Sequence, residues 1–236
     1  MRTVGILGGM GPQATILLMQ KVLSAIPAQD DRDHIPLIVD HNPQVPSPIK
    51  ALIEGTGESP GPTLVAMARR LEIAGCKGLA MPCNTAHHYA KEIKAAVTIP
   101  FLDMITATAN ALALQVPQGG RVGMLASPAV RKSRLYEPAL TSHGLQLVYP
   151  EDDATMLNII RAVKCGETRQ PGKSLAQEAT RLWQEKGCSH LLVSCTELSL
   201  LTDAIPAPLS WTDSLDVLAQ DIVRFSRNGG RAVGFS

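Results

Sequence analysis

The stretch Met81-Pro82-Cys83-Asn84-Thr85 is echoed later in the chain by Val193-Ser194-Cys195-Thr196-Glu197. In both stretches a cysteine follows an apolar run, and small polar residues follow the cysteine at once. The preceding context repeats too, because Gly75-Cys76 and Gly187-Cys188 stand at the same distance before each cysteine. This matched spacing indicates one structural unit used twice, and we expect it to bring the two thiols face to face.

Alternating apolar strand patterns and helical patterns extend from these stretches through the whole chain. Strands are predicted at residues 3–7, 36–39, 78–82, 99–102, 121–126, 145–149 and 191–194. Helices are predicted at 12–26, 62–74, 85–96, 104–114, 128–143, 154–165, 173–186 and 213–227, with a frayed tail at 229–236. The pattern restarts after Gly120, so we expect an α/β fold of two similar lobes, each a parallel β-sheet flanked by helices. Ligands of such sheets lie beyond the carboxyl ends of the strands, where both cysteines fall.

The predicted position of each cysteine suits acid–base chemistry. A thiol at a helix N-terminus faces unpaired amides and the positive end of the helix dipole, which lowers its pKa and favours the thiolate. Asn84, Thr85 and Thr196 add donors that can hold a ligand carboxylate. One thiolate can remove a proton from a carbon while the other thiol protonates the opposite face. Cys76, Cys165 and Cys188, by contrast, are expected to be structural cysteines in the core.

Composition excludes several classes of function. The 236 residues carry a net charge of +1 without a basic cluster, so nucleic acid is not an expected partner. No apolar run of about 18 residues is present, which predicts no membrane span. Five cysteines without a CxxC pair argue against a disulfide framework and against a metal site, and they favour a reducing cytoplasm.

Three other motifs carry weaker signals. Gly9-Met10-Gly11-Pro12-Gln13-Ala14 fits the dinucleotide fingerprint, but we expect a tight turn whose amides face the site. His87-His88 is expected on a helix surface, and Asp152-Asp153 in a loop or helix cap.

Three motifs resemble the aspartate/glutamate racemase superfamily, and most of all its aspartate and broad-specificity racemase branch. They are Gly-Gly-Met-Gly-Pro at 8–12, Pro-Cys-Asn-Thr-Ala-His at 82–87 and Cys-Thr-Glu at 195–197. The resemblance implies amino-acid racemisation by two cysteines without pyridoxal phosphate, another cofactor or a metal, in a pseudo-twofold cleft and commonly in a homodimer. It also implies a first lobe of residues 1–100 plus 210–236 and a second lobe of 101–209.

The same resemblance assigns roles to individual residues. Cys83 and Cys195 are the expected bases. The expected substrate-binding residues are Met10, Asn84, Thr85, Ser127, Lys164, Thr196 and Glu197. The sequence departs from the family at Pro48, where aspartate racemases place an arginine for the distal carboxylate. Lys50 is a candidate substitute, but it lacks the bidentate geometry of arginine, so strict aspartate specificity is not expected.

Alternatives remain open within and outside this class. Hydantoin racemases and maleate isomerases of the same superfamily also keep two cysteines. A two-lobed binding module without turnover belongs to a different class, and so does a nucleotide-dependent oxidoreductase. Exchange of a substrate α-proton with solvent separates the racemase from the binding module.

Overall fold

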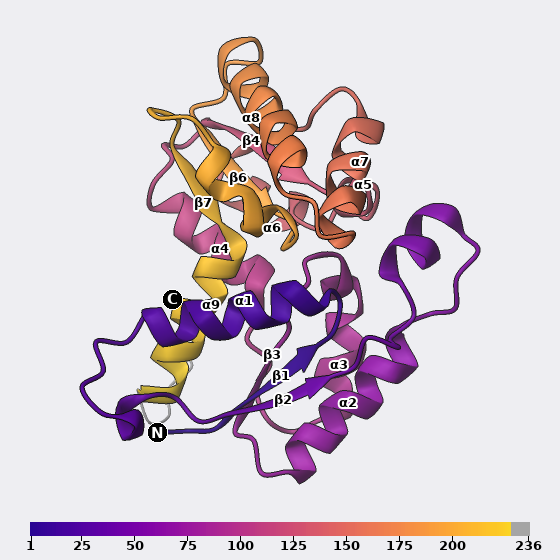
Figure 1. The fold of residues 1–236 in the computed structure, drawn as a ribbon, viewed down its shortest axis with the longest axis vertical. Helices are drawn as coiled ribbons and strands as arrows, with labels where there is room; N and C mark the ends of the chain where they lie inside the picture. The colour runs from indigo at the N-terminus through magenta and orange to yellow at the C-terminus, as the bar shows by residue number, and fades with distance from the viewer. Residues whose placement is uncertain (228–236) are drawn as a thin grey trace.

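The computed structural model describes residues 1–227, which form two all-parallel β-sheets (Figure 1). The strands are β1 (Val4–Gly8), β2 (Leu37–His41), β3 (Gly78–Ala80), β4 (Arg121–Ala126), β5 (Gln146–Val148), β6 (His190–Ser194) and β7 (Trp211–Asp213). The α-helices are α1 (Pro12–Ser24), α2 (Gly61–Ile73), α3 (Ala90–Ala96), α4 (Met104–Ala113), α5 (Pro128–Lys132), α6 (Glu137–Ser142), α7 (Asp153–Lys164), α8 (Arg169–Gln184) and α9 (Ser214–Arg227). Shorter helical segments are η1 (Asp31–Asp33), η2 (Lys50–Glu54), η3 (Thr85–Tyr89) and η4 (Leu198–Ala204). The predicted two-lobed α/β fold is confirmed, and the predicted tail at 229–236 lies outside the described residues. Within residues 1–227, none of the helices combines the length and apolar character that crossing a membrane requires.

The first sheet has the order β2-β1-β3, with the fully buried β1 in the middle. The strand expected at 99–102 is reduced to a single parallel bridge between Leu79 and Phe101. Leu79 donates its N–H to Pro100 O, and Leu102 donates to Leu79 O. Pro100 has no N–H to extend this ladder, which explains the short pairing.

The second sheet repeats this arrangement in the order β5-β4-β6-β7. Its central strand β4 pairs with β6, as β1 pairs with β3, and β7 lies where the Phe101 bridge lies in the first sheet. The internal repeat expected from the two cysteine stretches therefore holds for the order of the strands. It places β3 and β6, the strands that precede the two cysteines, at corresponding positions beside the central strand.

The last helix, α9, crosses from the second sheet to the first (Figure 1). It begins directly after β7, which is paired in the second sheet. Its apolar face nevertheless packs into the core of the first, where Leu215 and Ile222 lie in one buried cluster with Val4 and Leu18. The chain therefore changes lobe between Asp213 and Ser214. Burial of this apolar face from water stabilises the crossing.

The helix expected over residues 128–143 is wrong as one element, because it divides into α5 and α6. Arg134 lies between the two with a left-handed φ of 51°. Pro138 explains the break, since a proline inside a helix lacks the N–H and clashes with the preceding turn. At the second residue of the new helix α6, Pro138 is tolerated.

Candidate active site

Both cysteines lie buried just beyond the carboxyl ends of β3 and β6. Cys83 is 9% exposed and Cys195 is 6% exposed. Each is followed by a short 3-10 segment, η3 or η4, where the sequence pattern predicts an α-helix after Cys83. The backbone N–H groups of Thr85 and Ala86 point at the thiol of Cys83, and that of Glu197 points at Cys195. The expected amide donors around each sulfur are therefore present.

The two thiols share one electrostatic environment, in which Glu197 and Lys164 act on both. Burial, followed by the charge of Glu197, raises the pKa of Cys83 to about 11. The same two causes, with a hydrogen bond to Glu197, raise the pKa of Cys195 well above its ordinary value. The prediction of lowered thiol pKa values is therefore wrong for the free protein. Loss of solvent and a neighbouring carboxylate outweigh the amides and the opposing charge of Lys164.

Glu197 joins Cys195 to Lys164 through its two carboxylate oxygens. The thiol of Cys195 donates to Glu197 Oε2 over 3.2 Å, and Lys164 Nζ lies 3.1 Å from Oε1. Burial works against the ammonium of Lys164, but the charge of Glu197 and the hydrogen bond to it raise the pKa of Lys164 overall. The Lys164 ammonium, on the last residue of α7, is therefore held in its charged form, and its charge lowers the pKa of both thiols.

The turn after β1 brings the first lobe against the Glu197 carboxylate. A Cβ on Gly9, whose φ is 102°, would lie 2.4 Å from the Asn42 carbonyl, so only glycine fits. A Cβ on Gly11 would lie 3.4 Å from Glu197 Oε1, which places the turn beside the carboxylate. Met10 packs in the same buried cluster as Cys83. A carboxylate at this turn disfavours the pyrophosphate that a dinucleotide fingerprint would bind, because the two anions repel each other.

Asn84, Thr85 and Ser127 form hydrogen bonds that connect the two lobes. Asn84 Nδ2 donates to Ser214 Oγ over 3.0 Å, and Tyr136 Oη donates to Asn84 Oδ1 over 2.6 Å. Thr85 Oγ1 lies 3.1 Å from Ser127 Oγ. These polar groups are thus held in fixed orientations by protein partners, and Thr85 and Ser127 approach each other from opposite lobes.

His87 is buried, so its predicted place on a helix surface is wrong, whereas His88 is exposed as expected. The Nδ1 of His87 lies 2.8 Å from Cys83 O, and the Nε2 of His87 accepts the N–H of Met104 over 3.3 Å. A carbonyl only accepts, so Nδ1 carries the proton and the ring is neutral. Burial also lowers the pKa of His87. His87 therefore connects the loop of Cys83 to the start of α4 through two hydrogen bonds.

The remaining predicted residues lie at different depths. Thr196 is buried between Cys195 and Glu197. Pro48 is buried, whereas Lys50 is exposed at the start of η2 and its backbone N–H bonds locally to Ser47 Oγ. Lys132 of α5 reaches back to this segment and donates to Ile53 O over 3.1 Å. A role for Lys50 at the substrate stays a prediction.

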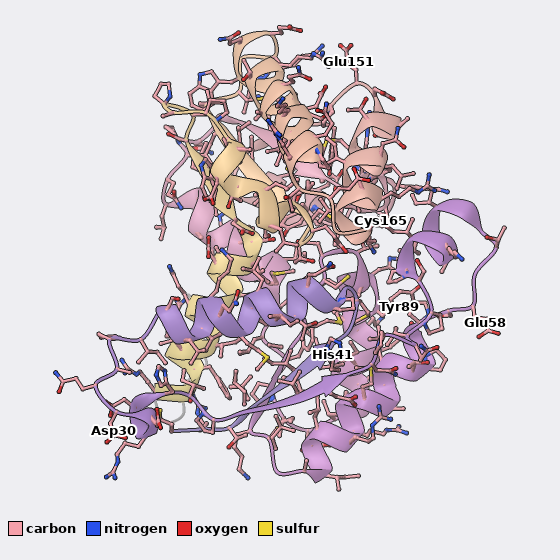
Figure 2. The ribbon with its side chains drawn as sticks, in the orientation of Figure 1. Asp30, His41, Glu58, Tyr89, Glu151 and Cys165 are labelled. Carbon is pink, nitrogen blue, oxygen red and sulfur yellow. The ribbon has the colours of Figure 1, made fainter. Side chains whose placement is uncertain are left out.

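The other cysteines and the acidic pair complete the comparison with the sequence. Cys76 and Cys188 are buried, but Cys165 is exposed at the end of α7 (Figure 2), so its predicted place in the core is wrong. Asp152 caps α7 by accepting from Ala154 and Thr155, as predicted. Within residues 1–227, no group of three His, Cys, Asp or Glu side chains is arranged to hold a metal ion.

Tyr136, Ser214 and His87 are the contributors to this site that the sequence patterns missed. Tyr136 and Ser214 are joined to Asn84 across long stretches of chain, and no local periodicity marks them. His87 did carry a signal, because it belongs to the Pro-Cys-Asn-Thr-Ala-His motif.

Comparison with known proteins gives a consistent result. The family model described as Asp/Glu/Hydantoin racemase matches residues 7–222. The broad specificity amino-acid racemase RacX of Bacillus subtilis is 27% identical over 232 residues, covering 93% of this chain and 96% of that protein. The Picrophilus torridus aspartate racemase structure has a TM-score of 0.86 at 29% identity, covering 96% of this chain and 94% of that one. A Bacillus anthracis glutamate racemase, RacE1, shares the fold with a TM-score of 0.66 at 20% identity, covering 97% and 82%. Since the family model spans most of the sequence, the chain belongs to the Asp/Glu/Hydantoin racemase family.

Proposed function

We propose that the protein is a cofactor-independent amino-acid racemase in which Cys83 and Cys195 are the two bases. The observation that carries this proposal is the shared environment of the two thiols. Each follows the corresponding strand of its lobe, and Glu197 and Lys164 act on both. Membership of a racemase family and the named activities of the relatives support the reaction class.

In this mechanism one cysteine must become a thiolate before it removes the α-proton. Both thiols are neutral in the free protein, since burial and Glu197 raise their pKa values. Glu197 Oε2, 3.2 Å from the Cys195 sulfur, is placed to accept that proton. The Cys195 thiolate then takes the α-proton from one face, and the Cys83 thiol protonates the opposite face. The other enantiomer reacts with the two cysteines exchanging roles.

The carbanion intermediate requires donors that face the substrate carboxylate as negative charge develops on it. Thr85 and Ser127, whose hydroxyls meet across the lobes, are candidates for this role. The charged Lys164 adds a positive field close to both sulfurs. Because these groups are oriented before substrate arrives, little reorganisation accompanies the charge shift.

We expect a broader substrate range than aspartate alone. Pro48 removes the arginine that would hold a distal carboxylate, and Lys164 is already paired with Glu197. With that arginine absent and Lys164 paired, the site gains less from an acidic side chain. The relative named as a broad specificity amino-acid racemase agrees with this expectation. A substrate panel should include aspartate, glutamate, neutral amino acids and hydantoins, because the family description includes hydantoin racemases.

The assembly proposed for this enzyme is a homodimer, and its proposed location is the cytoplasm. Ile16, Met19 and Leu23 leave an exposed apolar stripe on α1, which a second copy would cover. A two-thiol mechanism needs reduced cysteines, which a reducing compartment maintains. Size-exclusion chromatography with light scattering should give twice the chain mass of 25.2 kDa. The mass of a monomer would contradict the dimer.

Exchange of the α-proton in D₂O across this panel tests the function. Wild type should exchange and racemise at least one amino acid. Cys83→Ser and Cys195→Ser should each lose racemisation, and one of them can retain exchange from a single enantiomer. Cys165→Ser is the matched control, because it removes an exposed thiol outside the site. Full racemisation by either Cys83→Ser or Cys195→Ser would contradict the two-base assignment, and ligand binding without any exchange would indicate a binding module.

A further inference from the structure

We propose that the β7–α9 junction, Asp213 and Ser214, is a positioning element that holds both cysteine loops from one point of the chain. Its meaning for catalysis rests on the proposed racemase function, but its effect on the two thiols does not. The two residues are adjacent and buried where the chain passes from the second sheet to the first.

Ser214 holds the loop of Cys83. Its Oγ accepts the Nδ2–H of Asn84 over 3.0 Å, and Asn84 is the residue after Cys83. The other end of that amide is fixed by Tyr136, whose hydroxyl donates to Oδ1 over 2.6 Å. Asn84 is therefore held at both ends in a buried setting, where an unpaired amide group would be costly. Loss of the Ser214 hydroxyl frees one end and loosens the loop of Cys83.

Asp213 holds the loop of Cys195. Ser199 Oγ donates to Asp213 Oδ1 over 2.8 Å, and both side chains are buried. Ser199 lies in η4, whose first residue, Leu198, donates its N–H to Cys195 O over 2.9 Å. The hydrogen bond of Ser199 thus anchors the segment that directly follows Cys195.

The Asp213 carboxylate is itself anchored by residues of the first lobe. Leu215 donates its N–H to Oδ1 over 2.8 Å, which caps α9. Lys21 of α1, in the first lobe, places Nζ 3.5 Å from Oδ2 and 2.5 Å from Asp216 Oδ1. Burial raises the pKa of Asp213 to about 6, so the carboxylate is still charged at neutral pH. A shift of α9 would therefore move Asp213 and Ser214 together, and with them both cysteine loops. The relative position of the two sulfurs is thereby maintained.

The test compares the alkylation rate of each cysteine in variants of the full chain that carry one substitution at Ser214, Ser199 or Asp213. The Cys165→Ser background removes the exposed thiol, and iodoacetamide labelling at pH 8 is followed by mass spectrometry of each cysteine peptide. Ser214→Ala should accelerate labelling of Cys83 by about fivefold and leave Cys195 unchanged, because a loosened loop exposes its buried thiol. Ser199→Ala should do the reverse. Asp213→Ala should accelerate both, and Asp213→Asn, which keeps an acceptor oxygen, should accelerate them less.

Ser226→Ala is the matched control. Ser226 is equally buried at the far end of α9 and donates to Arg2 O, so its loss removes a comparable bond without touching either cysteine loop. It should leave both rates at the wild-type value. Equal acceleration of both thiols in Ser214→Ala or Ser199→Ala, acceleration of neither, or acceleration of both in Ser226→Ala would overturn the proposal. None of these readouts depends on racemisation, so a failure of the proposed function would be seen separately in the D₂O exchange assay.

Discussion

At the scale of single residues, Glu197 adds to burial in keeping both thiols protonated. Its oxygens contact the Cys195 thiol and the Lys164 ammonium, and its charge raises the pKa of both cysteines. The backbone amides and Lys164 lower both thiol pKa values, but by less than burial and Glu197 raise them. The thiols are therefore poised as proton donors until a substrate arrives.

Glu197→Gln should lower the pKa of both cysteines, because the negative charge is removed and Lys164 is left unpaired. Racemisation should fall by about 10²-fold or more, the usual cost of losing a positioned proton acceptor. The pH dependence of thiolate absorbance gives the pKa shift. Glu178→Gln is the control, since Glu178 is also buried and paired, with Arg181, but outside the site. Unchanged thiol titration in Glu197→Gln would contradict the assigned role.

His87→Ala should destabilise the fold by about 2 kcal/mol, because the Met104 N–H and the Cys83 carbonyl each lose a buried partner. Urea unfolding measures this free energy. His88→Ala is a control at the next residue, which is exposed, and it should change the free energy by less than about 0.5 kcal/mol. Equal effects of the two substitutions would show that the His87 contacts contribute nothing.

At the scale of elements, the apolar patterns of strands and the signals of helix caps were predictable from sequence. The strands before Cys83 and Cys195 lie where predicted, and α4 begins at Met104 as predicted, with Asp103 as its cap. The failures have local physical causes. Pro138 interrupts the helix expected over 128–143, and Pro100 limits a strand to one bridge. Both prolines are visible in the sequence, and at both places the missing N–H outweighs the hydrophobic periodicity.

The cap of α9 by Asp213 predicts a pH-dependent stability. Burial raises the pKa of Asp213 to about 6, above the value near 3.9 of an unfolded chain. The folded state therefore favours the protonated carboxyl, and this contribution is present in acid and is lost as the pH rises through 6. Relative to Asp213→Asn, the wild type should lose about 1 kcal/mol of unfolding free energy between pH 5 and pH 7. Lys21 and Asp216 also act on the Asp213 carboxyl, and both residues are present in the wild type and in Asp213→Asn. A difference that does not change with pH would contradict the raised pKa.

At the scale of the whole molecule, the repeat in the sequence corresponds to two sheets whose strands follow the same order. What the sequence could not supply is the set of contacts between the lobes. Asn84 is bonded to Tyr136 and to Ser214, residues 52 and 130 positions away. The pair with Tyr136 forms when the two lobes pack together, and the pair with Ser214 forms when α9 crosses to the first lobe. No periodicity of either partner encodes them. The cysteines, Glu197 and Lys164 were therefore predictable as site residues, whereas the contacts of Tyr136 and Ser214 with Asn84 and the raised thiol pKa values were not.

The central claim is that two cysteines act on opposite faces of one carbon. Isotope incorporation in D₂O, started separately from each enantiomer and stopped at low conversion, tests it most directly. A two-base enzyme delivers a solvent deuteron to the product from the second thiol, while the unreacted substrate keeps its protium. We predict deuterated product and protiated substrate in both directions. Product that retains the original α-proton in either direction would show that a single base returns the same hydrogen, and it would contradict this mechanism.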